Sequence, residues 1–314
     1  MNKIMDKKTK LYTPWVIWYI IITVVAQYVL INYKDKINFI DTDVFILLGA
    51  PDSVNIYNGQ YWGVLTNNFL HVYLSQLILN CIGIIVFGYF IEKKIGFIKF
   101  SIIIVIAGII PSILQLNLTD QPGIGLSGIN FTLFGFIISK AFVNKEYRLK
   151  WIFLYLFIMI AIVIYFSFYN LFVNDVYRSE AMSFGFILGL FIGYLSNKKI
   201  WIQLTVLFII MSISISTLFY APWSTEWQVY KGYQAHKNKE FHVAKKRYEK
   251  ALEIDPDNEQ AIENIKLIEL DKLKLKAYKV FVKEDYKRAK KIYEEILEIS
   301  PNDEWALNAY KELQ

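Results

Sequence analysis

The chain has 314 residues, of which 55% are hydrophobic, and its 34 Lys and Arg against 28 Asp and Glu give a net charge of +6. Such an apolar composition excludes an ordinary soluble globular protein and predicts several membrane spans. A single cysteine and three histidines exclude a disulfide framework and a Cys-based metal site within one chain. We therefore expect no cofactor and no metal.

Seven apolar segments are long enough, or nearly so, to cross a bilayer, which takes about 20 residues each. They lie near residues 14–32, 71–91, 98–117, 125–143, 151–170, 180–196 and 200–220. A short basic stretch, 1–13, precedes the first segment, and no small-x-small cleavage site follows it, so we expect a retained anchor and not a signal peptide. The predicted fold is all-α, a polytopic membrane helix bundle over residues 14–220.

Basic residues gather in alternate loops between these segments. They are Lys93, Lys94, Lys99, Lys140, Lys145, Arg148, Lys150, Lys198 and Lys199. Since positive residues prefer the cytoplasm, we expect a cytoplasmic amino terminus and, after seven spans, an extracellular carboxy terminus. Residues 222–314 hold 18 basic and 18 acidic residues, so the net charge belongs to the membrane half. It therefore indicates orientation in the cell membrane and no nucleic-acid partner.

The tail, residues 224–314, contains a repeat. FHVAKKRYEKALEIDPDNEQA (241–261) aligns with YKRAKKIYEEILEISPNDEWA (286–306) at an offset of 45 residues. This pattern resembles a tetratricopeptide (TPR) repeat, whose period is about 34. The extra residues equal about three helical turns, so the intervening helix, roughly 258–280, can be longer without changing face. An unrelated antiparallel helical hairpin is the alternative. The resemblance implies a soluble α-helical TPR-like domain that binds a protein or peptide ligand.

The segment GIGLSGINFTLFGF (123–136) places a serine between glycines at the head of an apolar run. Small residues allow membrane helices to pack closely, and most Gly and Ser residues in apolar helices do only that. The motif alone therefore does not distinguish a nucleophile from a packing residue.

Three segments, in chain order, resemble the rhomboid family of intramembrane serine proteases. They are YWGVLTNNFLHVYLSQLILNCIGIIVFG (61–88) with EKKIG (92–96), GLSGINFTLFG (125–135) and AMSFGFILGLFIG (181–193). In the family these carry a His-x-x-x-Asn motif, the serine nucleophile, and an Ala-His pair followed by spaced glycines. The resemblance implies six core helices plus a seventh, with transmembrane proteins as substrates or clients in the lipid bilayer.

The resemblance assigns four site positions. Ser127 matches the nucleophile, and Asn80 matches the asparagine that stabilises the oxyanion. Gln76 takes the place of the histidine in His-x-x-x-Asn, where its amide can still donate a hydrogen bond. Met182 takes the place of the catalytic histidine, and a thioether cannot accept the serine proton.

The other departures also affect ionisable groups. Gly63 replaces the arginine of the family's Trp-Arg pair, so we expect the first outside loop to be less well anchored. The glycines that pack the sixth helix remain: Gly185, Gly189 and Gly193. This is the pattern expected of a retained fold with lost chemistry.

No other residue is a convincing base. His71 lies five residues before Gln76, about 140° around a helix, so we expect it to point away from the face of Gln76 and Asn80 and to act as a polar anchor. Two histidines, His236 and His242, belong to the tail and would have to fold back into the site. Two carboxylates, Asp175 and Glu180, lie in the outer loop near Met182, but carboxylates are weak bases toward serine.

Loss of the base from a serine protease costs up to about a million-fold in turnover, or roughly 8 kcal/mol. The sequence therefore predicts a catalytically impaired rhomboid protein that binds transmembrane clients, and it leaves enzyme activity open. The alternative is an active intramembrane serine endopeptidase with Ser127 as nucleophile. A transporter or channel fits less well, because the spans hold almost no ionisable groups.

Overall fold

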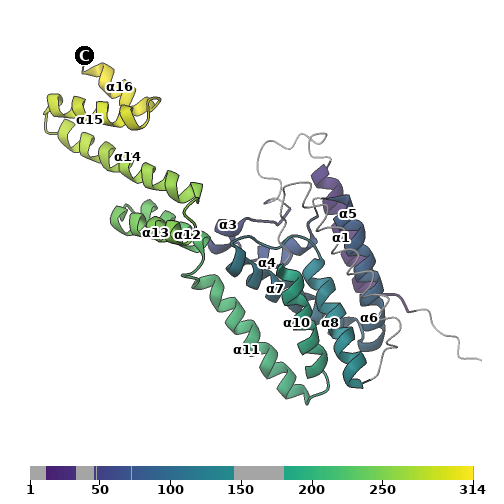
Figure 1. Cartoon of the computed structure of the whole chain (residues 1–314). Helices are drawn as coiled ribbons and strands as arrows, with labels where there is room; N and C mark the ends of the chain where they lie inside the picture. Colours follow the sequence, from purple (N-terminus) through teal and green to yellow (C-terminus); the bar gives the residue numbers. More distant parts are fainter. Residues whose placement is uncertain (1–11, 33–45, 47, 72, 145–179, 314) are drawn as a thin grey trace, which may run out of the picture. The chain divides into compact units, whose positions relative to one another are not determined.

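A computed structural model describes residues 12–32, 46, 48–71, 73–144 and 180–313 (Figure 1). The chain divides into two compact units, residues 1–220 and 221–314. The described residues are helical or irregular, which agrees with the predicted all-α class.

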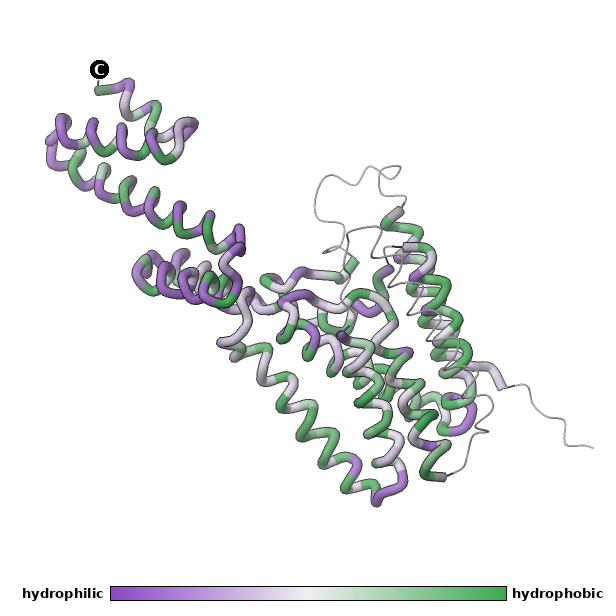
Figure 2. The backbone as a smooth tube through the Cα atoms, in the orientation of Figure 1, coloured by the Kyte–Doolittle hydropathy of each residue, from purple (hydrophilic) through white to green (hydrophobic). Residues whose placement is uncertain are grey.

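The first unit is built around apolar helices. Its elements are α1 (Trp15–Asn32), α3 (Ser53–Tyr57), α4 (Gly63–Thr66), the short 3₁₀ helix η2 (Asn67–Phe69), α5 (Leu74–Gly83), the π-helical turn η3 (Ile84–Gly88), α6 (Tyr89–Ile95), α7 (Phe97–Thr119), α8 (Ser127–Asn144), α10 (Glu180–Leu195) and α11 (Ile200–Phe219). Figure 2 shows hydrophobic residues along these longer helices.

Six of the seven predicted spans fall on described helices. Three are long and apolar enough to cross a membrane: Leu74–Ile95, Phe97–Thr119 and Ile200–Phe219. Three are shorter apolar helices: Trp15–Ile31, Ser127–Val143 and Glu180–Leu195. The segment predicted near 151–170 lies outside the described residues. The second span begins later than expected because Tyr73 is extended (φ −108°, ψ 139°), and it continues to Ile95.

Helices α8 and α10 are packed backbone to backbone through glycines. A Cβ atom added at any of three positions on α10 would overlap α8. The three contacts join Gly185 to the Gly128 carbonyl, Gly189 to the Thr132 carbonyl and Gly193 to Ser139 and the Phe136 carbonyl. Because both partners advance by four residues at each step, the two helices run parallel with their small faces together.

Glu92 ties the second span to the first helix. Its side chain is fully buried. One carboxylate oxygen accepts hydrogen bonds from the Tyr12 hydroxyl (3.2 Å) and from the backbone N–H of Val16 (3.3 Å). A carboxylate at the first turn of α1 satisfies a free helix donor and complements the helix dipole.

The second unit contains five helices among its described residues. They are α12 (Thr225–Lys237), α13 (Phe241–Ile254), α14 (Glu259–Phe281), α15 (Tyr286–Ile299) and α16 (Glu304–Glu312). Figure 2 shows hydrophilic residues, in purple, interrupted by hydrophobic ones, in green, along these helices. Helix α14 covers the long intervening helix that the sequence predicts.

The backbone of this unit repeats at the 45-residue offset found in the sequence. Lys239 and Glu284, which are 45 residues apart, both have left-handed backbones, with φ of 63° and 62°, in the turns that follow α12 and α14. At the same offset, Tyr248 and Tyr293 are buried in the two small cores. Each hairpin therefore uses the same turn and the same central aromatic side chain.

The N-caps also repeat, and the second one carries an ion pair. Asn258 caps α14, and Asp303 caps α16 by accepting from the Ala306 N–H (3.0 Å). Asp303 also pairs with Lys274 Nζ at 2.6 Å. Burial alone raises the pKa of Asp303, but the hydrogen bonds from Lys274 and Ala306 outweigh it and the pKa is lowered.

We predict that a fragment of residues 221–314 folds alone and that Asp303→Asn weakens it. A lowered folded-state pKa contributes stability above the unfolded pKa, and that contribution is lost as the pH falls through the folded value. Asn still caps the helix, so only the ionic part, about 0.5–1 kcal/mol, is lost at pH 7. Urea unfolding followed by circular dichroism at pH 7 and pH 3 measures both effects. The exposed Asp257→Asn is the control; equal changes in the two variants would contradict the prediction.

Candidate functional site

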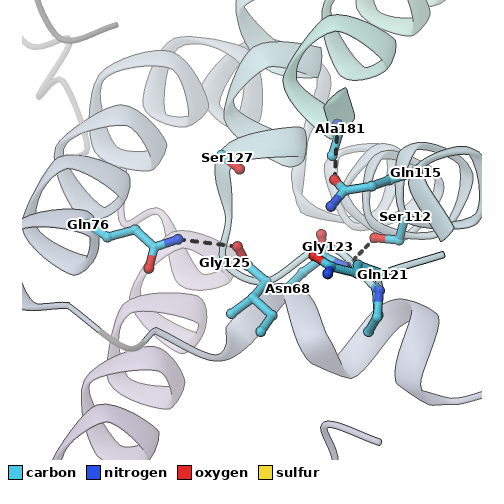
Figure 3. A pocket seen from close by; sticks show the side chains of 11 residues that line it. Asn68, Gln76, Ser112, Gln115, Gln121, Gly123, Gly125, Ser127 and Ala181 are labelled. Carbon is cyan, nitrogen blue, oxygen red and sulfur yellow. Dashed lines mark hydrogen bonds between the residues drawn. The ribbon is translucent and has the colours of Figure 1, made fainter. Parts of the chain in front are cut away.

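A cavity of about 230 Å³ lies where the loop before α8 meets α5 and α7. Its wall consists of Asn68, Gln76, Ser112, Gln115, Gln121, Pro122, Gly123, Ile124, Gly125, Ser127 and Ala181. Figure 3 shows these side chains around the opening. The polar side chains in this wall are hydroxyls and carboxamides, so the lining is neutral.

Ser127 is the first residue of α8 and is half-buried in this wall. The glycine two residues earlier, Gly125, has φ +92°, a conformation that side chains with a Cβ rarely adopt. Its N–H donates to the carbonyl of Asn67 at 3.1 Å, which fixes the loop. The Gly-x-Ser-Gly spacing therefore serves a sharp entry into the helix, with the serine at the turn.

Gln76 and Asn80 lie one turn apart on α5, and both amides face this loop. Gln76 Nε2 donates to the carbonyl of Ile124 at 3.2 Å (Figure 3). A Cβ atom on Gly125 would lie 2.8 Å from Gln76 Nε2 and 3.3 Å from Asn80 Nδ2. The structure thus brings the amide nitrogens of these two predicted site residues against the loop that leads into Ser127.

His71 is not where helical geometry placed it. It is fully buried, and its Nε2 lies 3.0 Å from Asn80 Nδ2. The expectation that it points away from Asn80 is wrong because α5 begins only at Leu74, after the extended Tyr73. The 100° per residue rule does not apply across that break.

Both ring nitrogens of His71 are engaged. Nδ1 lies 3.2 Å from the Phe69 carbonyl, and Nε2 also faces the N–H of Leu126 at 3.5 Å. His71 precedes the span that starts at Leu74. Burial lowers the pKa of His71 to about 4, although the hydrogen bond to the Phe69 carbonyl acts in the opposite direction. At neutral pH His71 is therefore an uncharged structural group with no free nitrogen for Ser127.

Met182 lies in the first turn of α10 and is half-buried. It is seven residues, or two turns, before Gly189, so helical geometry directs it to the α8 side. The Gly185 to Gly128 contact lies one turn further along, which sets position 182 at the level of the loop before Ser127. Ala181, its neighbour, lines the cavity itself.

Comparison with known proteins finds one family that this part of the chain resembles. Residues 58–201 match the family model described as the rhomboid domain. This segment, less than half of the chain, is similar to a rhomboid domain.

Three relatives show how far the likeness extends. The rhomboid protease GluP of Bacillus subtilis is 28% identical over 110 residues, which cover 35% of this chain and 22% of that protein. RHOMBOID-like protein 6, mitochondrial, of Arabidopsis thaliana is 33% identical over 99 residues, covering 31% and 32%. The rhomboid protease GlpG of Haemophilus influenzae is 23% identical over 121 residues, covering 38% and 62%. The chain thus spans less than two thirds of each relative's length and is distantly related to rhomboid proteases.

The described part of the loop ahead of α5 is closely packed around Gly63, a contact that the sequence did not predict. A Cβ atom at Gly63 would overlap the ring of Pro51, so the absence of a side chain allows these segments to touch. Asn67 Nδ2 donates to the Pro51 carbonyl at 3.3 Å, and the Thr66 hydroxyl donates to the Gly49 carbonyl. Close packing anchors the loop where the family uses an arginine.

We predict that Gly63→Arg, which restores the family residue, destabilises the protein. The first side-chain atoms have no room, and overpacking of this kind costs about 1–3 kcal/mol. Thermal unfolding of the purified protein in detergent measures the loss. The exposed Asn58→Arg in the same loop controls for the added charge; a rise in stability for Gly63→Arg alone would show that the arginine still finds its anchoring site.

Nothing in the described part of the chain groups three His, Cys, Asp or Glu side chains for a metal ion.

Asn130, on α8, is a further polar residue of the site that sequence reasoning missed. Its Nδ2 donates to both the backbone carbonyl and Oδ1 of Asn80, each at 3.0 Å. The available signal was a carboxamide inside the apolar run that follows Ser127, since such a group is costly in a membrane helix unless it is paired.

Proposed function

We propose that this rhomboid-family protein binds transmembrane client proteins without cleaving them. The observation that carries the proposal is the neutral wall of the cavity beside Ser127. A serine hydroxyl becomes a nucleophile only when a neighbouring base accepts its proton. Carboxamides and hydroxyls are not bases at neutral pH.

Two further residues support the lack of a base. Met182 stands where the family has its catalytic histidine, and a thioether does not take up a proton. His71, the one histidine in residues 1–220, has both nitrogens engaged. Without a base the barrier rises by about 8 kcal/mol, which a retained oxyanion site does not offset.

The alternative is an active intramembrane serine endopeptidase with Ser127 as nucleophile. The retained Ser127 and the amides of Gln76 and Asn80 beside its loop favour it. In the active alternative Gln76 and Asn80 would be the oxyanion donors, and a group other than Met182 would have to act as the base.

A serine-reactive fluorophosphonate probe separates the two functions. We expect no labelling of Ser127 in the wild-type protein in lipid nanodiscs, while an active rhomboid protease is labelled under the same conditions. Crosslinking in the same nanodiscs should still capture a single-span client helix intact. Labelling that disappears in Ser127→Ala would establish the enzyme and reject the proposal.

We also propose that residues 224–314 form a TPR-like domain that binds a protein or peptide ligand. The support is the paired hairpins at a 45-residue offset, with the same left-handed turn residues and buried tyrosines. Stacked helical hairpins present an extended surface suited to such ligands.

We further propose that the chain lies in the cell membrane with this domain outside the cell, because the basic loops alternate. Protease added to intact cells should then remove the region after Trp223. A cytoplasmic protein serves as the control for cell integrity. A protected tail, with a known surface domain digested, would overturn the orientation and the count of seven spans.

A further inference from the structure

The side chain of Asn130 packs against α5 at Gly83, where any other residue would place a Cβ atom in its way. A Cβ atom on Gly83 would lie 2.8 Å from the carboxamide of Asn130. Asn130 is itself almost fully buried, with 3% of its surface exposed. The contact sits where α5 gives way to the π-helical turn Ile84–Gly88. Such turns are rare and occur often at functional sites.

The hydrogen bonds of Asn130 fix the orientation of two further side chains. A backbone carbonyl only accepts, so the Asn130 atom at 3.0 Å from the Asn80 carbonyl is its nitrogen. The same nitrogen contacts the Asn80 side chain, which must therefore present its oxygen there. Asn80 then directs its nitrogen the other way, toward His71 Nε2 at 3.0 Å.

The direction of this chain extends through the imidazole. Because Nε2 of His71 accepts from Asn80, the ring proton lies on Nδ1 and is donated to the Phe69 carbonyl. Each group in this chain therefore donates to the next: Asn130 to Asn80, Asn80 to His71, and His71 to the Phe69 carbonyl. The Asn80 nitrogen that results faces Gly125, in the loop that leads to Ser127.

Asn130 retains a cost of its own. Its Oδ1 is buried and has no hydrogen-bond partner among the described residues. An unsatisfied buried oxygen destabilises a fold, so an apolar side chain would suit packing better. The amino group of Asn130 is therefore the feature that this position uses.

We infer that Asn130 is a positioning residue that sets the orientation of the Asn80 carboxamide and so determines that a donor, and not an acceptor, faces the loop before Ser127. The inference deepens the proposed function, since the oxyanion-side role of Asn80 belongs to that proposal. The orientation itself is measurable without it.

The test is the tautomer of His71 in the full chain, labelled with ¹⁵N-histidine in lipid nanodiscs at neutral pH. His236→Gln and His242→Gln assign the other two histidine signals. The wild type should carry its proton on Nδ1, with Nε2 unprotonated. In Asn130→Asp the carboxyl, once its ¹³C shift shows that it is ionised, only accepts hydrogen bonds, so Asn80 should turn its nitrogen toward it and its oxygen toward His71. Part of the His71 population should then carry its proton on Nε2, although the Phe69 carbonyl and the Leu126 N–H both favour the proton on Nδ1.

Asn130→Leu, similar in shape, is the matched control: it offers no acceptor and should leave the proton of His71 on Nδ1. A proton on Nε2 in the wild type overturns the inference even if no variant folds. An unchanged His71 in a folded Asn130→Asp variant, or an equal change in both variants, also overturns it. In a Met182→His background that cleaves, Asn130→Asp should lower the rate at least tenfold more than Asn130→Leu. Failure of this cleavage arm alone would count against the oxyanion role of Asn80 and not against its orientation.

Discussion

Met182→His should give the protein a slow, Ser127-dependent cleavage of a transmembrane substrate, whereas the wild type should show none. Ser127 and the amides of Gln76 and Asn80 already surround the loop before α8. The register of α10 on α8 directs position 182 to the level of that loop. Histidine therefore supplies the one group that the neutral wall lacks, a base that titrates near neutral pH.

The expected gain is large and the structural cost is modest. A base and its nucleophile together account for up to about a million-fold in turnover, so even an imperfectly placed imidazole is detectable above a silent background. Met and His have similar volumes, and the new polar group costs about 1–3 kcal/mol. Because position 182 is half-buried, water can hydrate part of the imidazole and reduce that cost.

Cleavage is measured with a fluorescent single-span substrate in liposomes, and Met182→His with Ser127→Ala is the matched control. Met182→Gln, which is polar but not basic, should remain inactive. Gln76→His added to Met182→His should raise the rate by restoring the second family histidine. Wild-type cleavage that needs Ser127 would reject the proposal that the protein binds clients without cleaving them. Inactivity of both histidine variants, once folding is verified, would show that α10 holds position 182 away from Ser127.

The sequence was sufficient for the features that follow from periodicity and spacing. Apolar length predicts the spans, and four-residue steps between glycines predict that the sixth helix packs closely, although they do not identify α8 as its partner. The Gly-x-Ser-Gly motif places Ser127 at the turn into α8, where the left-handed Gly125 requires a glycine. These features depend on local sequence and on rigid helices, so they can be derived without tertiary contacts.

The sequence was insufficient where a contact joins distant segments. His71 could be placed only by assuming that the helix extends back to it, and the extended Tyr73 breaks that assumption. The partner of Asn130 lies 50 residues away, so no spacing indicates it. Gly63 was interpreted as a lost anchor because no sequence spacing indicates its contact with Pro51, which fills its space.

The second large effect is expected at Gly189. A Cβ atom there would overlap the Thr132 carbonyl, and α8 and α10 touch along their length, so Gly189→Ala forces the helices apart.

Alanine favours a helix over glycine by about 1 kcal/mol, which works in the opposite direction. Overpacking against a backbone costs about 1–3 kcal/mol, and a shift at Gly189 also disturbs the two neighbouring glycine contacts, so we expect a net loss of stability. Unfolding of the purified protein in mixed micelles of increasing sodium dodecyl sulfate measures it. Ile187→Ala, on the same helix with 62% of its surface exposed, should change little. If Gly189→Ala is as stable as the wild type, the close contact of α8 and α10 that sets position 182 beside Ser127 does not exist, and the expected gain from Met182→His is lost with it.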